Sequence, residues 1–197
     1  MKRIIATVLS LLLVTCVLAG CGEEKLKITD EEAFDVLSSL VPKSYEINEA
    51  FFGKGLPRED DAQYDKTKYV PVDLGKSAFV SIRSMKNAAE QVYSRNYLDS
   101  IYVIMFIGTE SSESDGLLNN DTSPRYKEIS GELCIDAAFK PYNILGRLDV
   151  ISVKVSKRTA EYVSVDAVCR DESGAELNKT FYLTVENGVW LLDGPTY

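Results

Sequence analysis

The sequence predicts an α+β fold in which N-terminal helices pack on one face of a curved antiparallel sheet. Two observations lead to this prediction. Apolar residues recur at helical spacing in the N-terminal half, and the period changes to two in the C-terminal half. The chain has 197 residues, of which 45% are apolar, enough for one sizeable core and too few for several domains. We therefore expect a single domain over residues 29–197.

Residues 1–20 have the pattern of a secretory signal peptide. Lys2 and Arg3 form a basic start, and an apolar run follows from Ile4 to Val17. The run ends at Leu18-Ala19-Gly20-Cys21, which resembles the lipobox of bacterial lipoproteins. The resemblance implies cleavage before Cys21 and a diacylglycerol on its thiol.

Residues 21–28 are therefore predicted to form a lipidated tether. Through the acylated Cys21, the protein is expected to bind the lipid bilayer. An uncleaved membrane helix fits less well, because Glu23, Glu24 and Lys25 follow the apolar run at once. The next densest apolar stretch, residues 102–107, is far too short to cross a bilayer. The sequence thus predicts an extracytoplasmic protein that is held by lipid at the outer face of the cell membrane.

Charge and composition exclude several classes of function. The chain has 22 basic and 30 acidic residues; without residues 1–20, which hold two basic residues and no acidic one, the ratio is 20 to 30 and the net charge is -10. Non-specific nucleic-acid binding requires an excess of Lys and Arg to neutralise phosphates, so a domain this acidic is unsuited to it. The chain contains no histidine, which excludes His-based triads, His-containing zinc sites and imidazole catalysts. We expect no cofactor.

The first helix is predicted to begin at a capping box formed by Thr29 and Glu32. Helical spacing continues behind it through Phe34, Leu37 and Val41. Pro42 interrupts the pattern, which then resumes as far as Gly53. Both a bent helix and two consecutive helices fit this segment.

Residues 58–68 are strongly polar and are predicted to form a loop, followed by a short edge strand over residues 69–72 that Pro71 interrupts. Helical spacing returns at Met85, Ala89 and Val92. A second run over residues 97–106 is predicted as helix, although it is also good strand material.

Residues 108–124 form the longest irregular segment of the body and are rich in Ser, Asp, Asn and Gly. Long loops of this kind are either functional or mobile. Four of their polar side chains are our candidates for contact with a partner: Asp115, Asn119, Asn120 and Asp121. These residues lack the alternation and the final glutamate of an EF-hand loop, so no metal site is predicted.

The C-terminal part is predicted to be an antiparallel meander. A first strand lies within residues 129–137, and hairpin turns are expected at residues 171–174 and at Asn187-Gly188, before a last strand over residues 189–192. The apolar faces of the strands between them are Ile151, Val153 and Val155; Val163, Val165, Ala167 and Cys169; and Phe181, Leu183 and Val185.

Helices followed by a meander that ends in residues 190–197 resemble the cystatin-like and ketosteroid-isomerase-like cone folds, often found in small lipoproteins of Gram-positive bacteria. Residues 92–102 and 193–197 are similar to IseA-type proteins, which are extracellular inhibitors of the DL-endopeptidases that cut peptidoglycan stem peptides. The resemblance implies a non-enzymatic binding module whose partner is a cell-wall hydrolase or another envelope protein. The family inhibits through a loop whose residue pattern is not matched here, so no inhibitory residues are carried over.

Two alternatives follow from the cone fold. The protein could carry a small apolar ligand in its interior, with Tyr93, Tyr97 and Tyr102 lining the pocket, although such residues are more often the cover of a sheet. It could also be an isomerase or dehydratase that uses Asp99 or Asp166. Both carboxylates have the parity of a solvent-facing residue, and the chain has no Ser-x-x-Lys or Gly-x-Ser-x-Gly motif, so no catalytic residue is predicted.

Two cysteines, Cys134 and Cys169, remain in the body once Cys16 has left with the signal and Cys21 carries lipid. An oxidising exterior permits a disulfide between them. Two buried free thiols are the alternative, because free cysteine is among the most buried residue types.

Overall fold

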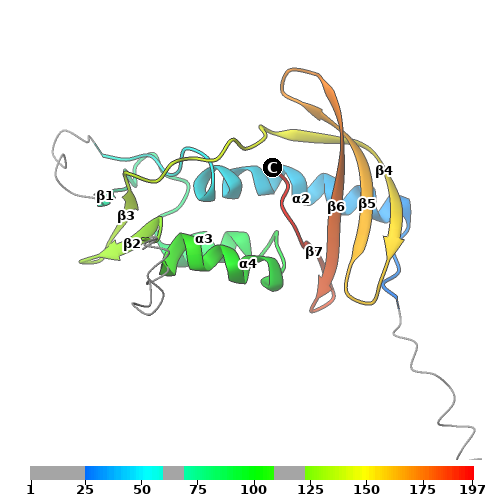
Figure 1. Cartoon of the computed structure of the whole chain (residues 1–197), viewed down its shortest axis with the longest axis horizontal. Helices are drawn as coiled ribbons and strands as arrows, with labels where there is room; N and C mark the ends of the chain where they lie inside the picture. Colours follow the sequence, from blue (N-terminus) through cyan, green and yellow to red (C-terminus); the bar gives the residue numbers. More distant parts are fainter. Residues whose placement is uncertain (1–24, 60–68, 109–122) are drawn as a thin grey trace, which may run out of the picture.

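The computed structural model of the chain describes residues 25–59, 69–108 and 123–197. It confirms the α+β class, with helices and two antiparallel sheets (Figure 1). The helices are α2 (Asp30–Phe51), α3 (Ile82–Ala89), α4 (Arg95–Tyr102) and the π-helical turn η2 (Val103–Ile107). The strands are β1 (Tyr69–Pro71), β2 (Tyr126–Ile129), β3 (Glu132–Asp136), β4 (Leu148–Arg158), β5 (Val163–Asp171), β6 (Glu176–Glu186) and β7 (Val189–Leu192).

Helix α2 runs along the long axis of the molecule, with one sheet at each end (Figure 1). The predicted capping box is confirmed: the Glu32 amide donates to Thr29 Oγ1 at 3.1 Å, and the Thr29 amide donates to Glu32 Oε2 at 2.8 Å. The segment is one continuous helix rather than two, with Pro42 inside it. Buried side chains on both sides of the proline, Leu37 and Ile47 among them, hold the helix together across the lost hydrogen bond.

The larger sheet has the order β4-β5-β6-β7, and its inner face packs on α2. The predicted apolar row of β5 is confirmed, since Val163, Val165, Ala167 and Cys169 are all buried. The predicted alternation in β4 is wrong at Ile151, which is 39% exposed. A bulge between Val150 and Ser152 inserts one extra residue there and changes the parity of the strand.

The prediction of a single meander is also wrong, because the strand predicted within residues 129–137 does not belong to the larger sheet. This strand is β3, which pairs with β1 on one side and β2 on the other in a separate three-stranded sheet at the C-terminal end of α2. Ile135 is opposite both Val70 and Tyr126 in the register. Contacts between distant parts of the chain thus decide which sheet β3 enters.

Several other local predictions agree with the structure, whereas the predicted signal peptide, most of the loop at residues 58–68 and most of the irregular segment at residues 108–124 lie outside the described residues. Met85, Ala89 and Val92 are buried, and residues 97–106 are helical through α4 and η2. Asn187 and Gly188 both have positive φ, 52° and 79°, as a type I′ hairpin turn requires. No helix in the described ranges is long and apolar enough to span a membrane.

Candidate functional site

A network of four buried polar side chains lies between α2 and the C-terminal tail. The Tyr93 hydroxyl donates to Asn48 Oδ1 at 2.8 Å, and Asn48 Nδ2 donates to Thr196 Oγ1 at 2.6 Å. The Ser44 hydroxyl donates to the carbonyl oxygen of Val41 at 2.7 Å and lies 2.8 Å from Thr196 Oγ1. The hydroxyl protons of Tyr93 and Ser44 are thus donated to other acceptors. The Thr196 hydroxyl therefore donates to the hydroxyl oxygen of either Tyr93 or Ser44. The C-terminal tail, residues 193–197, thus contributes Thr196, which contacts the other three side chains.

The space on one side of this network is nearly filled. The space between α2, the segment that leads into β4 and the tail has a volume of about 10 Å³. A cavity of this size holds about one water molecule. No ligand fits in this space, and the polar groups of the network satisfy one another.

The three tyrosines proposed as pocket residues do not line a common pocket, although Tyr93 borders a polar hollow of about 430 Å³ that Glu90, Arg95 and Glu186 also line. Tyr93 is 2% exposed, and its ring lies 5.1 Å from that of Tyr97. Tyr102 packs on the Phe106 ring at 5.4 Å, and its ring receives the Lys86 ammonium at 4.8 Å. Burial raises the pKa of Tyr97 and of Tyr102 above the ordinary tyrosine value.

Burial also raises the pKa of Tyr93, to about 12, although its hydrogen bonds oppose the shift. The folded protein thus holds the Tyr93 proton more tightly than the unfolded chain, and this contribution to stability is lost as pH rises from about 10 to about 12. We expect the phenolate absorbance of Tyr93, measured at 295 nm as the difference between the wild type and Tyr93→Phe, to develop only near pH 12 or on unfolding. Ionisation near pH 10 in a protein still folded by circular dichroism would contradict this.

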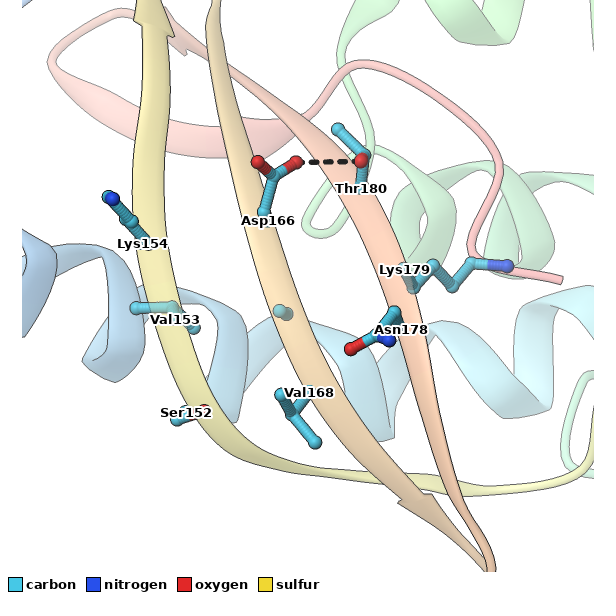
Figure 2. Close-up of a pocket in the computed structure, with 9 residues that line it drawn as sticks. Ser152, Val153, Lys154, Asp166, Val168, Asn178, Lys179 and Thr180 are labelled. Carbon is cyan, nitrogen blue, oxygen red and sulfur yellow. Dashed lines mark hydrogen bonds between the residues drawn. The ribbon is translucent and has the colours of Figure 1, made fainter.

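The outer face of the larger sheet is the candidate binding surface. Figure 2 shows the hollow at its centre, of about 350 Å³, formed by β4, β5 and β6. Two cross-strand rows face outward there, and α2 lies on the opposite face of the sheet. The rows are Lys154, Asp166 and Thr180, and Ser152, Val168 and Asn178.

The hollow presents both charges and neutral hydrogen-bonding groups. Asp166 accepts a hydrogen bond from the Thr180 hydroxyl at 2.7 Å through one oxygen, and its second oxygen faces solvent (Figure 2). Lys154 is directly opposite Asp166 in the register, yet no ion pair joins them. Within the described part of the chain, the Ser152 hydroxyl and the Asn178 amide also have no protein partner. These four groups are free to bind a ligand.

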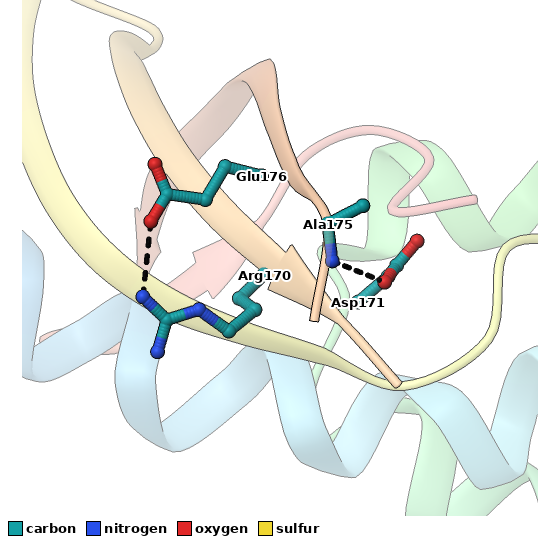
Figure 3. Close-up of polar contacts among 4 residues, drawn as sticks. All are labelled: Arg170, Asp171, Ala175 and Glu176. Atoms are coloured by element: carbon teal, nitrogen blue, oxygen red, sulfur yellow. Dashed lines mark hydrogen bonds and ion pairs between the residues drawn. The ribbon is translucent and has the colours of Figure 1, made fainter. Parts of the chain in front are cut away.

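Paired side chains border the surface at both ends. At one end Arg170 pairs with Glu176 at 2.9 Å, and Asp171 accepts from the Ala175 amide at 3.0 Å (Figure 3). At the other end the Tyr162 and Tyr182 rings meet edge to face at 5.7 Å, and Tyr182 is 41% exposed. The sequence indicated the parity of Asp166, but the hollow depends on the pairing of β4 with β5, which the bulge sets.

The remaining predicted site residues are placed as follows. Cys134 lies in β3 and Cys169 in β5, so the two buried thiols belong to different sheets, and no disulfide joins them. Burial raises the pKa of both thiols. Lipid-attachment residue Cys21 lies outside the described residues, as do the partner candidates Asp115, Asn119, Asn120 and Asp121.

Asp99 and Asp166, the carboxylates considered for catalysis, are both exposed. Over residues 25–59, 69–108 and 123–197, no group of three or more Cys, Asp and Glu side chains could hold a metal ion. The sequence matches no protein-family model and no curated protein.

Proposed function

We propose that the protein is a non-enzymatic, lipid-anchored binding protein of the cell envelope, with a cystatin-like cone as its body, that inhibits or modulates a peptidoglycan hydrolase. One observation supports it above the others. Unpaired groups of Lys154, Ser152 and Asn178 and one oxygen of Asp166 gather on an uncovered sheet face, whereas the space between α2 and the tail is closed.

The surface suits a polar protein partner. Lys154 and Asp166 place opposite charges side by side in a hollow bordered by the exposed ring of Tyr182. Mixed charges beside an exposed tyrosine are typical of protein interfaces, in which charge gives specificity and aromatic rings give contact area. The signal-like N-terminus and the IseA-like segments indicate where such a partner is found.

The same observations weigh against the alternatives. A carrier of an apolar ligand needs a cavity lined by apolar side chains, but the space beside the Ser44–Thr196 pair is about 10 Å³. The hollow of about 350 Å³ that Ile47, Phe79 and Val92 line is also lined by three charged side chains, Lys43, Glu46 and Arg147. An isomerase or dehydratase needs a carboxyl group held inside a pocket with a raised pKa. Asp99 and Asp166 both face solvent.

The proposal is tested by clearing of peptidoglycan sacculi with a DL-endopeptidase that cuts stem peptides. A molar excess of residues 22–197 is expected to slow the loss of turbidity, and the two proteins are expected to co-elute. Unchanged clearing together with separate elution would refute the proposal.

Neutralising the hollow is expected to weaken this inhibition. We expect Asp166→Asn combined with Lys154→Gln to raise the half-inhibitory concentration about tenfold, corresponding to about 1.4 kcal/mol of binding free energy. The melting temperature should change little, because both side chains are exposed. Asp35→Asn with Lys43→Gln, the same two substitutions at exposed positions of α2, is the matched control and should inhibit like the wild type.

A further inference from the structure

The chain enters the body at the hairpin that joins β4 to β5, and it is fixed there. The Leu26 amide donates to the carbonyl oxygen of Thr159 at 2.8 Å. Arg158 Nη2 donates to the carbonyl oxygen of Ile28 at 2.7 Å, and the Ile28 side chain is 4% exposed. Residues 26–28 are thus part of the folded body.

The start of α2 is joined to the same strand. Asp30 Oδ1 accepts from the Val155 amide at 2.8 Å. Strand β4 is an edge of its sheet, so this amide has no ladder partner on that side. Figure 1 shows the first described residues beside the end of β4. The N-terminal entry point is therefore held in place by main-chain and side-chain contacts.

The tether before this point is short. Only three residues, Gly22, Glu23 and Glu24, separate Cys21 from Lys25. A fully extended chain advances at most about 3.5 Å per residue, so the distance from Cys21 to Leu26 is at most about 18 Å. A lipid on Cys21 would leave the hairpin little freedom to move away from the bilayer.

From these contacts we propose that the β4–β5 hairpin, residues 157–162, faces the lipid bilayer at a distance of about 20 Å or less. The small sheet is then the end of the molecule directed away from it. The inference rests on the lipid anchoring in the proposed function. The near end suits a headgroup region: Lys157 donates to the Tyr162 hydroxyl at 2.9 Å, and cations and tyrosines are favoured at membrane surfaces.

Exposed apolar side chains mark the far end of the molecule. Helix α2 has 22 residues and is about 33 Å long, which separates the two ends. Ile107 and Ile129, exposed by 66% and 44%, belong to η2 and β2, which contact each other at the far end. Lipid anchoring would thus direct these side chains toward the cell wall.

The test uses the full lipidated chain in vesicles of phosphatidylcholine and phosphatidylglycerol that contain a headgroup-bound quencher. A fluorophore is attached to Glu161→Cys in the hairpin or, as the matched control, to Glu132→Cys in β3. Both positions are exposed, whereas the native thiols of Cys134 and Cys169 are buried. We expect quenching at position 161 to exceed that at position 132 at least about threefold, because α2 separates the two ends by about 33 Å.

A ten-residue Gly/Ser insertion between Glu24 and Lys25 is expected to reduce the quenching at position 161, because a longer flexible tether allows the body to move away. Flotation distinguishes the two ways of failing. A wild type that does not float with vesicles, or unlipidated residues 22–197 that still float, overturns the lipid anchor and this orientation with it. A floating protein with equal or reversed quenching overturns the orientation alone.

Discussion

Arg125→Met is expected to lower the free energy of unfolding by about 3–5 kcal/mol. Arg125 is 1% exposed, and its guanidinium donates to the carbonyl oxygens of Phe51 and Gly53, each at 2.8 Å. These carbonyls lie at the C-terminal end of α2, where the helix has no internal donors for them and where a cation is electrostatically favoured.

Two effects oppose each other in this substitution. Removing the guanidinium relieves its desolvation, which also lowers the pKa of Arg125. It also leaves two buried carbonyl oxygens without donors and removes the contact with the Phe139 ring, 4.1 Å away. The second effect is larger, because each unsatisfied buried acceptor costs about 1–3 kcal/mol and methionine offers it nothing.

Urea unfolding followed by circular dichroism measures the effect. Arg125→Lys keeps the charge, but lysine lacks the planar guanidinium that donates to both carbonyls. We therefore expect its free energy of unfolding to lie between those of the wild type and Arg125→Met. Arg83→Met, at an exposed position of α3, is the control and should change stability by less than about 0.5 kcal/mol. A loss below about 1 kcal/mol in Arg125→Met would contradict this account of the helix end.

Thr196→Val is expected to cost about 2–3 kcal/mol, although the two side chains have nearly the same shape. The substitution removes the hydroxyl that accepts from Asn48 Nδ2 at 2.6 Å and contacts Ser44 and Tyr93 at 2.8 and 2.9 Å. The Asn48 amide would then be left buried without its acceptor. Thermal unfolding is the measurement.

A double-mutant cycle with Tyr93→Phe separates the network from general loss of packing. Because Tyr93 and Thr196 share the network, the double variant should lose less than the sum of the two single losses, by at least about 0.5 kcal/mol. Thr180→Val makes the same chemical change at an exposed position and should have little effect on stability. Additive losses would mean that the four side chains do not act as a unit.

The elements that the sequence predicted correctly depend on neighbouring residues. The capping box of Thr29 and Glu32, the stripe of Met85 and Ala89 and the Asn187-Gly188 turn each involve residues within a few positions of one another. Their geometry follows from backbone chemistry that does not require the rest of the fold.

Where prediction failed, the outcome depended on contacts between distant residues. Ile151 has the right parity for a regular strand, but the bulge appears only once β4 is paired with β5. Nothing near Glu132–Asp136 specifies pairing with β1, some 60 residues earlier in the chain. Arg125 follows a polar segment and gives no local sign of being buried, because its two acceptors come from the end of α2.

The candidate site divides in the same way. The sequence by itself determined the class of fold, the acidic body, the lack of histidine chemistry and the solvent-facing parity of Asp166, because composition and period are local properties. Only the tertiary structure decided that Thr196 closes the interior, that Lys154 lies opposite Asp166, and that the N-terminal entry is fixed to the β4–β5 hairpin. Each of these depends on the relative positions of segments far apart in the chain, and packing of the whole core sets those positions.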